Sequence, residues 1–172
     1  NPLIASHNGV DGRTIKGSID DYWIEYDSSA QDPYLTGGWT QHSWGDAIGD
    51  YMKTSQSIYK NTDGSTTFYT WKTNPGPLTC ANMETNNIDH LDGTYGRKLF
   101  YEARGYTVTD CYNQKTDNNG GGFTLADYKA EIDAGHPVML SLEGHTVVGF
   151  GYDGSTIYIR DTWDNDPSQT YT

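Results

Sequence analysis

The chain is poor in basic residues, with 11 lysines and arginines against 23 aspartates and glutamates among its 172 residues. The resulting formal charge of -12 repels phosphate backbones at long range, which argues against nucleic acid as a partner. Cysteine is scarce as well. The only two, Cys80 and Cys111, permit one disulfide, which an extracellular setting would favour, and two unpaired thiols are the alternative.

Long hydrophobic runs are also missing. No stretch approaches the roughly 18 apolar residues that cross a bilayer, so membrane insertion is not expected. Residues 1–5 show no basic region followed by a long apolar run, so any signal peptide is expected to have been removed already. The acidic, lysine-poor composition, rich in Asn, Thr, Ser, Gly and Tyr, is common in secreted microbial proteins. It predicts an extracellular or cell-surface location.

The length fits one domain with a core of ordinary size. Aromatic residues make up 13% of the chain, which argues against disorder and predicts an aromatic core. The texture of the sequence changes near residue 90, from a loop-rich, aromatic part to a strongly periodic one. A single domain, residues 1–172, is therefore expected to have a loop-rich helical part, 1–90, and a helix-plus-sheet part, 91–172.

Helical spacing in the first part predicts a helix over about 44–55, with the Ser43 hydroxyl capping the amide of Asp46. Residues 66–71 alternate β-branched and aromatic side chains, which suits a strand. Residues 73–92 are expected to form a loop, since Pro75-Gly76-Pro77 stands near its start.

The second part is strongly periodic. A helix is predicted from Tyr95 to about Arg104-Gly105, followed by a strand over 106–111. A capping box at Thr124 and Asp127 begins another helix, with Leu125, Tyr128 and Ile132 as its buried stripe. Strands are then expected over 137–143, 145–152 and 156–161, the last two joined by a hairpin turn at Asp153-Gly154. Helices packed on an antiparallel sheet define the α+β class.

Three segments carry a resemblance to a known family. They are Gly135-His136-Pro137-Val138-Met139-Leu140-Ser141-Leu142, Gly144-His145-Thr146-Val147-Val148-Gly149-Phe150-Gly151-Tyr152, and Ile157-Tyr158-Ile159-Arg160-Asp161-Thr162-Trp163. The pattern resembles the bacteriocin-processing, peptidase-C-thirty-nine-like cysteine peptidases. The resemblance implies a papain-like architecture, a peptide or protein substrate, His145 as general base, and Asp161 as the carboxylate that orients it.

The spacing of these two residues agrees with that chemistry. His145 begins one hairpin strand and Asp161 ends the other, so antiparallel pairing brings them near one another. A carboxylate on one imidazole nitrogen fixes the tautomer and leaves the other nitrogen free to take a thiol proton. On spacing alone, His145 could equally be a half-buried strand residue and Asp161 a turn former.

The nucleophile is the part that the sequence does not supply. In this family a cysteine is expected at the N-terminus of a helix, where the helix dipole lowers the pKa of the thiol. The helix after Ser43 offers Trp44-Gly45-Asp46-Ala47 and no cysteine, which would make the protein an inactive relative. The favoured alternative is a cysteine upstream of Asn1, because the chain opens abruptly and stops at 169–172 without a closing strand.

Cys80 and Ser43 are weaker candidates for the nucleophile. The order Cys80, His145, Asp161 matches the papain order, and residues 79–83 could open a short helix. However, the surroundings of Cys80 are loop-like without a nearby basic side chain, and a bond to Cys111 would account for both thiols. The capping role of Ser43 already explains that residue.

No cofactor is required by this chemistry, although calcium is considered. Hard oxygen ligands occur in three loop segments, 61–64, 117–119, and the group Asp161, Asp164 and Asp166, but none completes an EF-hand loop. Ordinary turn chemistry explains such clusters equally well. His42 and His90 lack the spacing of zinc ligands and are interpreted as structural.

A different class of function stays open. Tyr and Trp are enriched at interfaces, and 14 Tyr and 5 Trp are more than a catalytic site requires. A chain with the scaffold but no thiol could serve as a binding module, or as a homo-oligomeric surface assembly such as an adhesive or filament-forming domain.

Overall fold

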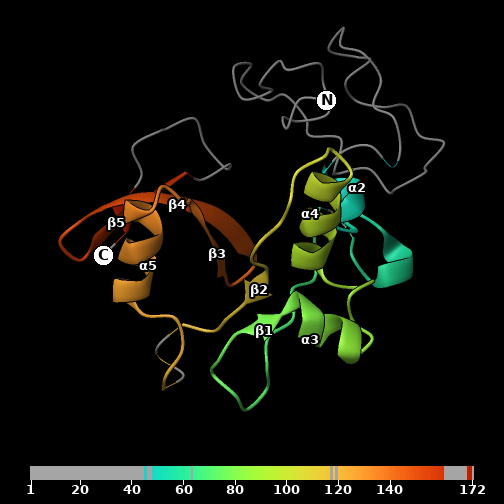
Figure 1. The fold of residues 1–172 in the computed structure, drawn as a ribbon, viewed down its shortest axis with the longest axis horizontal. Coiled ribbons are helices and arrows are strands. Elements are labelled where there is room, and N and C mark those ends of the chain that lie inside the picture. Colours follow the sequence, from blue (N-terminus) through green and yellow to red (C-terminus); the bar gives the residue numbers. More distant parts are fainter. Residues whose placement is uncertain are drawn as a thin grey trace, which may run out of the picture. The chain divides into compact units, whose positions relative to one another are not determined.

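The computed structural model describes Gly45 and residues 48–62, 64–116, 118, 120–160 and 170–171, the last two by their backbone alone. These residues belong to two compact units, Asn1–Lys72 with Pro77–Gln114, and Thr73–Gly76 with Lys115–Thr172. The division falls after Gln114, whereas the texture of the sequence changes near residue 90. The single domain stays a prediction, and each unit is described by itself (Figure 1).

The first unit contains helices and a two-stranded antiparallel sheet. Among its described residues the elements are α2 (Ile48–Tyr51), the 3-10 helix η3 (Ser57–Tyr59), β1 (Leu78–Thr79), α3 (Cys80–Thr85), α4 (Gly93–Glu102) and β2 (Tyr112–Asn113). The strands β1 and β2 pair with each other, Leu78 with Asn113 and Thr79 with Tyr112.

Asp92 is the main organising side chain of the first unit. It is only 1% exposed and caps α4 by accepting from the backbone N–H groups of Thr94 and Tyr95 at 2.8 and 3.1 Å. Its second oxygen accepts from the N–H of Tyr69 at 2.7 Å and from the Asn113 amide at 2.9 Å. Burial raises the pKa of the Asp92 carboxyl, and these hydrogen bonds oppose the increase.

These bonds explain why the predicted strand over 66–71 is wrong. The segment has no strand partner, and its backbone makes single contacts instead: Asp92 accepts from Tyr69 N–H, Asn113 donates to the Tyr69 carbonyl at 2.9 Å, and Gly93 N–H donates to the Thr67 carbonyl at 2.9 Å. Isolated hydrogen bonds, two of them to side chains, therefore take the place of a neighbouring strand. The strand predicted over 106–111 is also wrong, since pairing begins only at Tyr112.

The loop predicted over 73–92 contains β1 and α3. Thr79 caps α3 in a reciprocal capping box with Asn82, in which each side chain accepts from the other residue's backbone N–H. The box is easily missed in the sequence because Asn stands where Glu or Gln is usual. α4 begins two residues before its predicted start and ends two to three residues before its predicted end.

The helix predicted over 44–55 ends earlier than expected. Its start lies outside the described residues, and α2 stops at Tyr51 because Lys53 and Ser55 adopt positive φ angles of 64° and 53°. α4 packs closely against the C-terminal end of α2. A Cβ atom on Gly96 would lie 2.1 Å from the Tyr51 carbonyl oxygen, so only glycine permits this approach.

In the described part of the second unit, a helix packs with a four-stranded antiparallel sheet. The helix is α5 (Leu125–Asp133), and the strands are β3 (Val138–Leu142), β4 (His145–Asp153), β5 (Thr156–Arg160) and β6 (Thr170–Tyr171), in the order β3-β4-β5-β6. The Thr124–Asp127 capping box forms as predicted, and its hydrogen bonds lower the pKa of Asp127. Two expectations are wrong. No closing strand was expected, but β6 pairs with β5, and the hairpin turn is Gly154-Ser155 instead of Asp153-Gly154.

The core of the second unit lies between α5 and one face of the sheet. Tyr128, Val147 and Ile159 are 3%, 2% and 0% exposed. Leu125 was expected in the buried stripe but is 38% exposed, so Tyr128 dominates the inner face of α5. The α+β class is confirmed. None of the helices in the described ranges has the length and apolar character needed to span a bilayer.

Replacing Asp92 tests its role in the first unit. Asp92→Ala leaves four donors without their acceptor, three of them backbone N–H groups, and should lower the free energy of unfolding by about 3 kcal/mol or more. Asp92→Asn keeps one acceptor oxygen and should cost less. Urea unfolding followed by tryptophan fluorescence measures both, with Asp110→Ala at an exposed position as the control. A cost below about 0.5 kcal/mol for Asp92→Ala would contradict the assignment.

Candidate functional site

His145 is the first residue of β4 and is half-buried. It pairs with Leu142 of β3 across the tight turn at Glu143-Gly144. Residues that pair directly in an antiparallel sheet point to the same face, and side chains alternate along a strand. His145 therefore shares a face with Val147 and Gly149, which is the face that α5 covers.

β4 does not alternate regularly along its whole length. Gly149 pairs with Ile159, but Gly151 pairs with Tyr158, so Phe150 is an extra residue in a β-bulge. On the α5 side lie Gly149 and, three residues later, Tyr152, whose hydroxyl donates to the Asp133 carboxylate at 2.9 Å. Phe150, which is 48% exposed, and Gly151 both face the other side.

The bulge determines the face on which His145 lies. Suppose that β4 and β5 paired without a bulge from the hairpin pair Asp153 and Thr156 onward. Phe150 would then pair with Ile159, and His145 would lie on the face away from α5. With the bulge, Arg160 pairs with Val148, and His145 shares the inner face with Ile159. Sequence reasoning missed the bulge, although the glycines on either side of Phe150 are a signal for one.

Asp161 lies outside the described residues. It follows directly after Arg160, the last residue of β5, and Arg160 pairs with Val148, three positions along β4 from His145. The described strands therefore bring the end of β5 to the part of β4 that begins with His145. The assignment of Asp161 as the orienting carboxylate stays a prediction.

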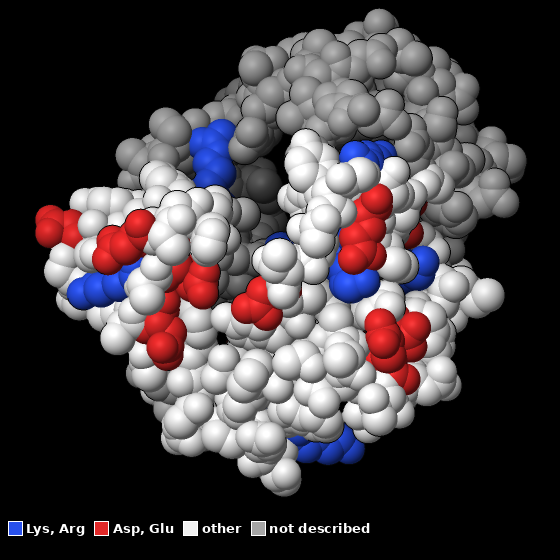
Figure 2. Space-filling model, in the orientation of Figure 1, with Lys and Arg blue, Asp and Glu red and all other residues white. Residues whose placement is uncertain are grey.

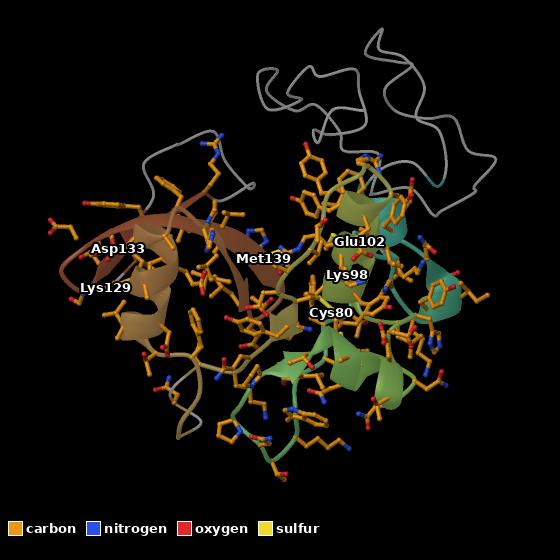
Figure 3. The ribbon with its side chains drawn as sticks, viewed as in Figure 1. Cys80, Lys98, Glu102, Lys129, Asp133 and Met139 are labelled. Atoms are coloured by element: carbon orange, nitrogen blue, oxygen red, sulfur yellow. A yellow bond between two sulfur atoms is a disulfide. The ribbon has the colours of Figure 1, made fainter. Side chains whose placement is uncertain are left out.

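Cys80 and Cys111 form a disulfide. Cys80 is the first residue of α3, is 5% exposed, and also donates its backbone N–H to the Cys111 carbonyl at 2.9 Å. The bond lies in a cluster with Leu78 and Met83, and Figure 3 labels Cys80. A sulfur in a disulfide is not a thiolate, so Cys80 cannot attack a peptide carbonyl while this bond is intact. Ser43, the other candidate, lies outside the described residues.

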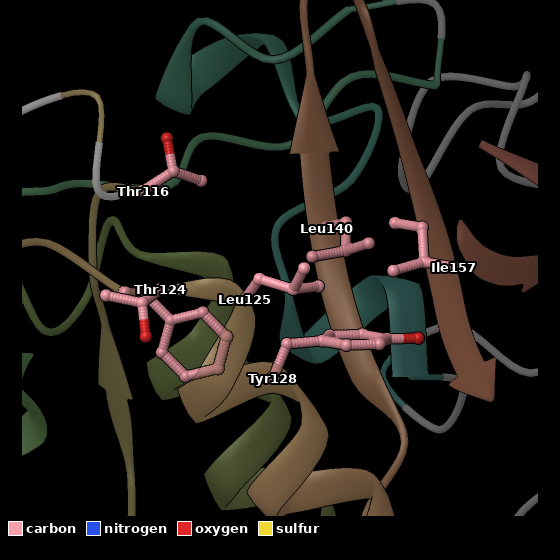
Figure 4. A pocket seen from close by; sticks show the side chains of 7 residues that line it. Thr116, Thr124, Leu125, Tyr128, Leu140 and Ile157 are labelled. Atoms are coloured by element: carbon pink, nitrogen blue, oxygen red, sulfur yellow. The ribbon is translucent and has the colours of Figure 1, made fainter. Parts of the chain in front are cut away.

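A small cavity lies among the described residues of the second unit, between α5 and the sheet (Figure 4). Its volume is about 150 Å³, and its walls are mainly apolar, with Leu125 and Tyr128 from α5, Leu140 from β3 and Ile157 from β5. Binding pockets for small molecules usually measure about 300–1,000 Å³. This cavity is therefore smaller than a usual binding pocket, and His145 is not among its lining residues.

The calcium hypothesis receives no support from the residues that can be described. Asn61, 1% exposed, donates its amide to the Lys53 carbonyl and accepts from the Thr67 hydroxyl, so it is structural. Asp63, Asp117, Asn119, and the group at 161, 164 and 166 lie outside the described residues, as does His42. The Nδ1 atom of His90 lies 3.8 Å from the Oδ1 atom of its neighbour Asp89. Within the described ranges, no three His, Cys, Asp or Glu side chains gather as a metal site would require.

Charge does not mark a site on the face shown in Figure 2, where acidic and basic side chains are interspersed. Some of them form local pairs, such as Lys98 with Glu102 at 2.8 Å. These pairs are exposed and contribute little to stability.

An α+β fold with a histidine at the start of a central antiparallel strand is the arrangement expected for a papain-like hydrolase. The sequence model of the Peptidase_C39 like family matches residues 34–172, and the chain belongs to this family. The resemblance drawn from the sequence is thereby confirmed. Neither the curated proteins nor the solved structures yielded a match to the chain.

The disulfide gives a direct prediction. Without reduction, the native 172-residue chain should take up no thiol-reactive maleimide, and after reduction under denaturing conditions both cysteines should react, as intact mass will show. The double variant Cys80→Ala/Cys111→Ala should lose about 2–4 kcal/mol of unfolding free energy. Rapid labelling of Cys80 in the unreduced native chain would contradict the assignment.

Proposed function

We propose that the protein is a secreted peptidase-like domain that hydrolyses peptide bonds with His145 as general base and Asp161 as its orienting carboxylate. The nucleophilic cysteine is proposed to lie in a part of the protein outside these 172 residues. Family membership supports a peptidase-like function with peptides as substrates. The position of His145, on the first residue of β4 and near the end of β5, is the observation that supports its role.

The proposed chemistry follows from the groups present. The His145 imidazole takes the thiol proton, the thiolate attacks the peptide carbonyl carbon, and the protonated imidazole gives its proton to the departing amine. Water then releases the acyl group from sulfur. The Asp161 carboxylate keeps the imidazole in the tautomer that accepts this proton. No metal ion is needed for these steps.

A second function is favoured by the disulfide. Because the chain's two cysteines are bonded to each other, these 172 residues contain no thiol. A chain with this scaffold and no thiol would bind peptides or assemble with copies of itself at the cell surface without cleaving them. The disulfide also supports an extracellular location, because such bonds persist in oxidising compartments.

Labelling of the naturally processed protein separates these two functions. A peptide-like electrophile is added without reduction, and modified residues are mapped by mass spectrometry. Hydrolysis predicts one fast-reacting cysteine outside these 172 residues, whose labelling slows by about 10²-fold or more in His145→Ala because the base is lost. Asp161→Asn should also slow it, since the imidazole loses its orienting group.

His136→Ala is the matched control, because His136 is an exposed histidine of the same unit whose ring contacts Glu131 at 3.0 Å. It should leave the labelling rate unchanged. If the complete protein has no reactive thiol, peptide hydrolysis by this mechanism is excluded and the binding function is retained.

A further inference from the structure

The sequence of β4 is also compatible with a second register, in which it pairs with β5 without a bulge. This regular register would turn Phe150 and Val148 toward α5, whereas the observed bulged register turns Gly149 and Val147 toward it. Phe150 and Val148 are 48% and 40% exposed in the structure. The hydrophobic pattern alone therefore favours the regular ladder, because it would bury the larger apolar side chains.

Tyr128 is the side chain that excludes this competitor. It is 3% exposed, and a Cβ atom on Gly149 would lie 2.5 Å from its hydroxyl oxygen and 2.7 Å from its ring. The space over Gly149 is thus already filled, and a phenylalanine could not enter it. The Tyr128 hydroxyl also donates to the Gly151 carbonyl at 3.0 Å, so the tyrosine contacts β4 on both sides of the bulged residue.

We propose that Tyr128 is a positioning residue for His145, because its ring keeps Phe150 out of the core and so holds β4 in the bulged register that turns His145 toward α5. In the regular register His145 and Val147 would both lie on the face opposite to Ile159. The catalytic meaning of this positioning rests on the proposed function, in which His145 is the base. The positioning itself is a property of the strand and holds without a nucleophile.

Truncating the tyrosine tests the proposal. Tyr128→Ala opens the space over Gly149, and Phe150 should move into it. The ratio of regular to bulged register should rise more than tenfold, since burying a phenylalanine side chain shifts an equilibrium by about one to two orders of magnitude. Tyr128→Phe is the matched control that keeps the ring. It should retain the bulged register, with about a fivefold rise in the minor form from the lost hydrogen bond.

Nuclear magnetic resonance of the full chain reports the register directly. With histidine labelled in the ring and assigned through His145→Gln, Tyr128→Ala should shift the His145 signal to a new environment. Cross-strand contacts should change from Gly149 with Ile159 to Phe150 with Ile159, and the Phe150 ring should gain contacts with α5. Tyr128→Leu, with an intermediate volume, serves in the same way if the alanine variant is unfolded.

Deletion of Phe150 distinguishes positioning from a general loss of stability. Without that residue the ladder is regular and still pairs Gly149 with Ile159, so His145 has only one available face. The deletion variant should therefore show the wild-type His145 environment, and adding Tyr128→Ala to it should not move the signal. Phe150→Ala keeps the extra residue but offers little apolar area to bury, so it should also suppress the effect of Tyr128→Ala.

An unchanged His145 environment and unchanged cross-strand contacts in folded Tyr128→Ala or Tyr128→Leu would overturn the proposal. So would the same shift of the His145 signal in the presence and absence of Phe150. Neither result depends on a reactive thiol, so failure here is distinguishable from failure of the proposed hydrolysis. If β4 has the bulged register but the cysteine of the complete protein reacts slowly with the electrophile, only the proposed function is contradicted.

Discussion

The Tyr128 ring occupies the space over Gly149, and the second unit is arranged around this contact. Because the space is filled, β4 keeps glycine at that position, accommodates Phe150 as an extra residue, and changes its alternation between Gly149 and Tyr152. The shift brings Val147 and Ile159 into one core and puts His145 on the same face. A bulge that re-aims a side chain near a functional site is a known use of this irregularity.

Polar side chains play the corresponding role in the first unit. The two strands in its described part, β1 and β2, are two residues long, so their ladder contributes little to organising that part. Asp92 instead accepts four hydrogen bonds and joins the start of α4, the segment at Tyr69, and β2. The disulfide adds a covalent link between the start of α3 and the segment before β2. These contacts involve residues far apart in sequence, which explains why local patterns described this unit poorly.

The chemistry of the chain is determined by one bond. Family membership and the position of His145 point to a peptidase, but the Cys80–Cys111 bond removes the chain's thiols from that role. The scaffold and the nucleophile are therefore separate questions for this protein. The scaffold is present in these residues, and a thiol nucleophile must come from elsewhere or be absent.

The sequence by itself determined the elements whose signals are local. The capping box at Thr124, the two helices α4 and α5, the strands β3, β4 and β5 and the α+β class all follow from spacing within a few residues, and the family resemblance rests on the sheet segments among them. Tertiary structure decided the rest. Residues 66–71 have the pattern of a strand but meet Asp92 and Asn113 instead of a partner strand. The face on which His145 lies could not be predicted from the sequence of β4 alone. The extra residue Phe150 inverts the alternation of side chains, and Tyr128 of α5 determines on which face Phe150 lies.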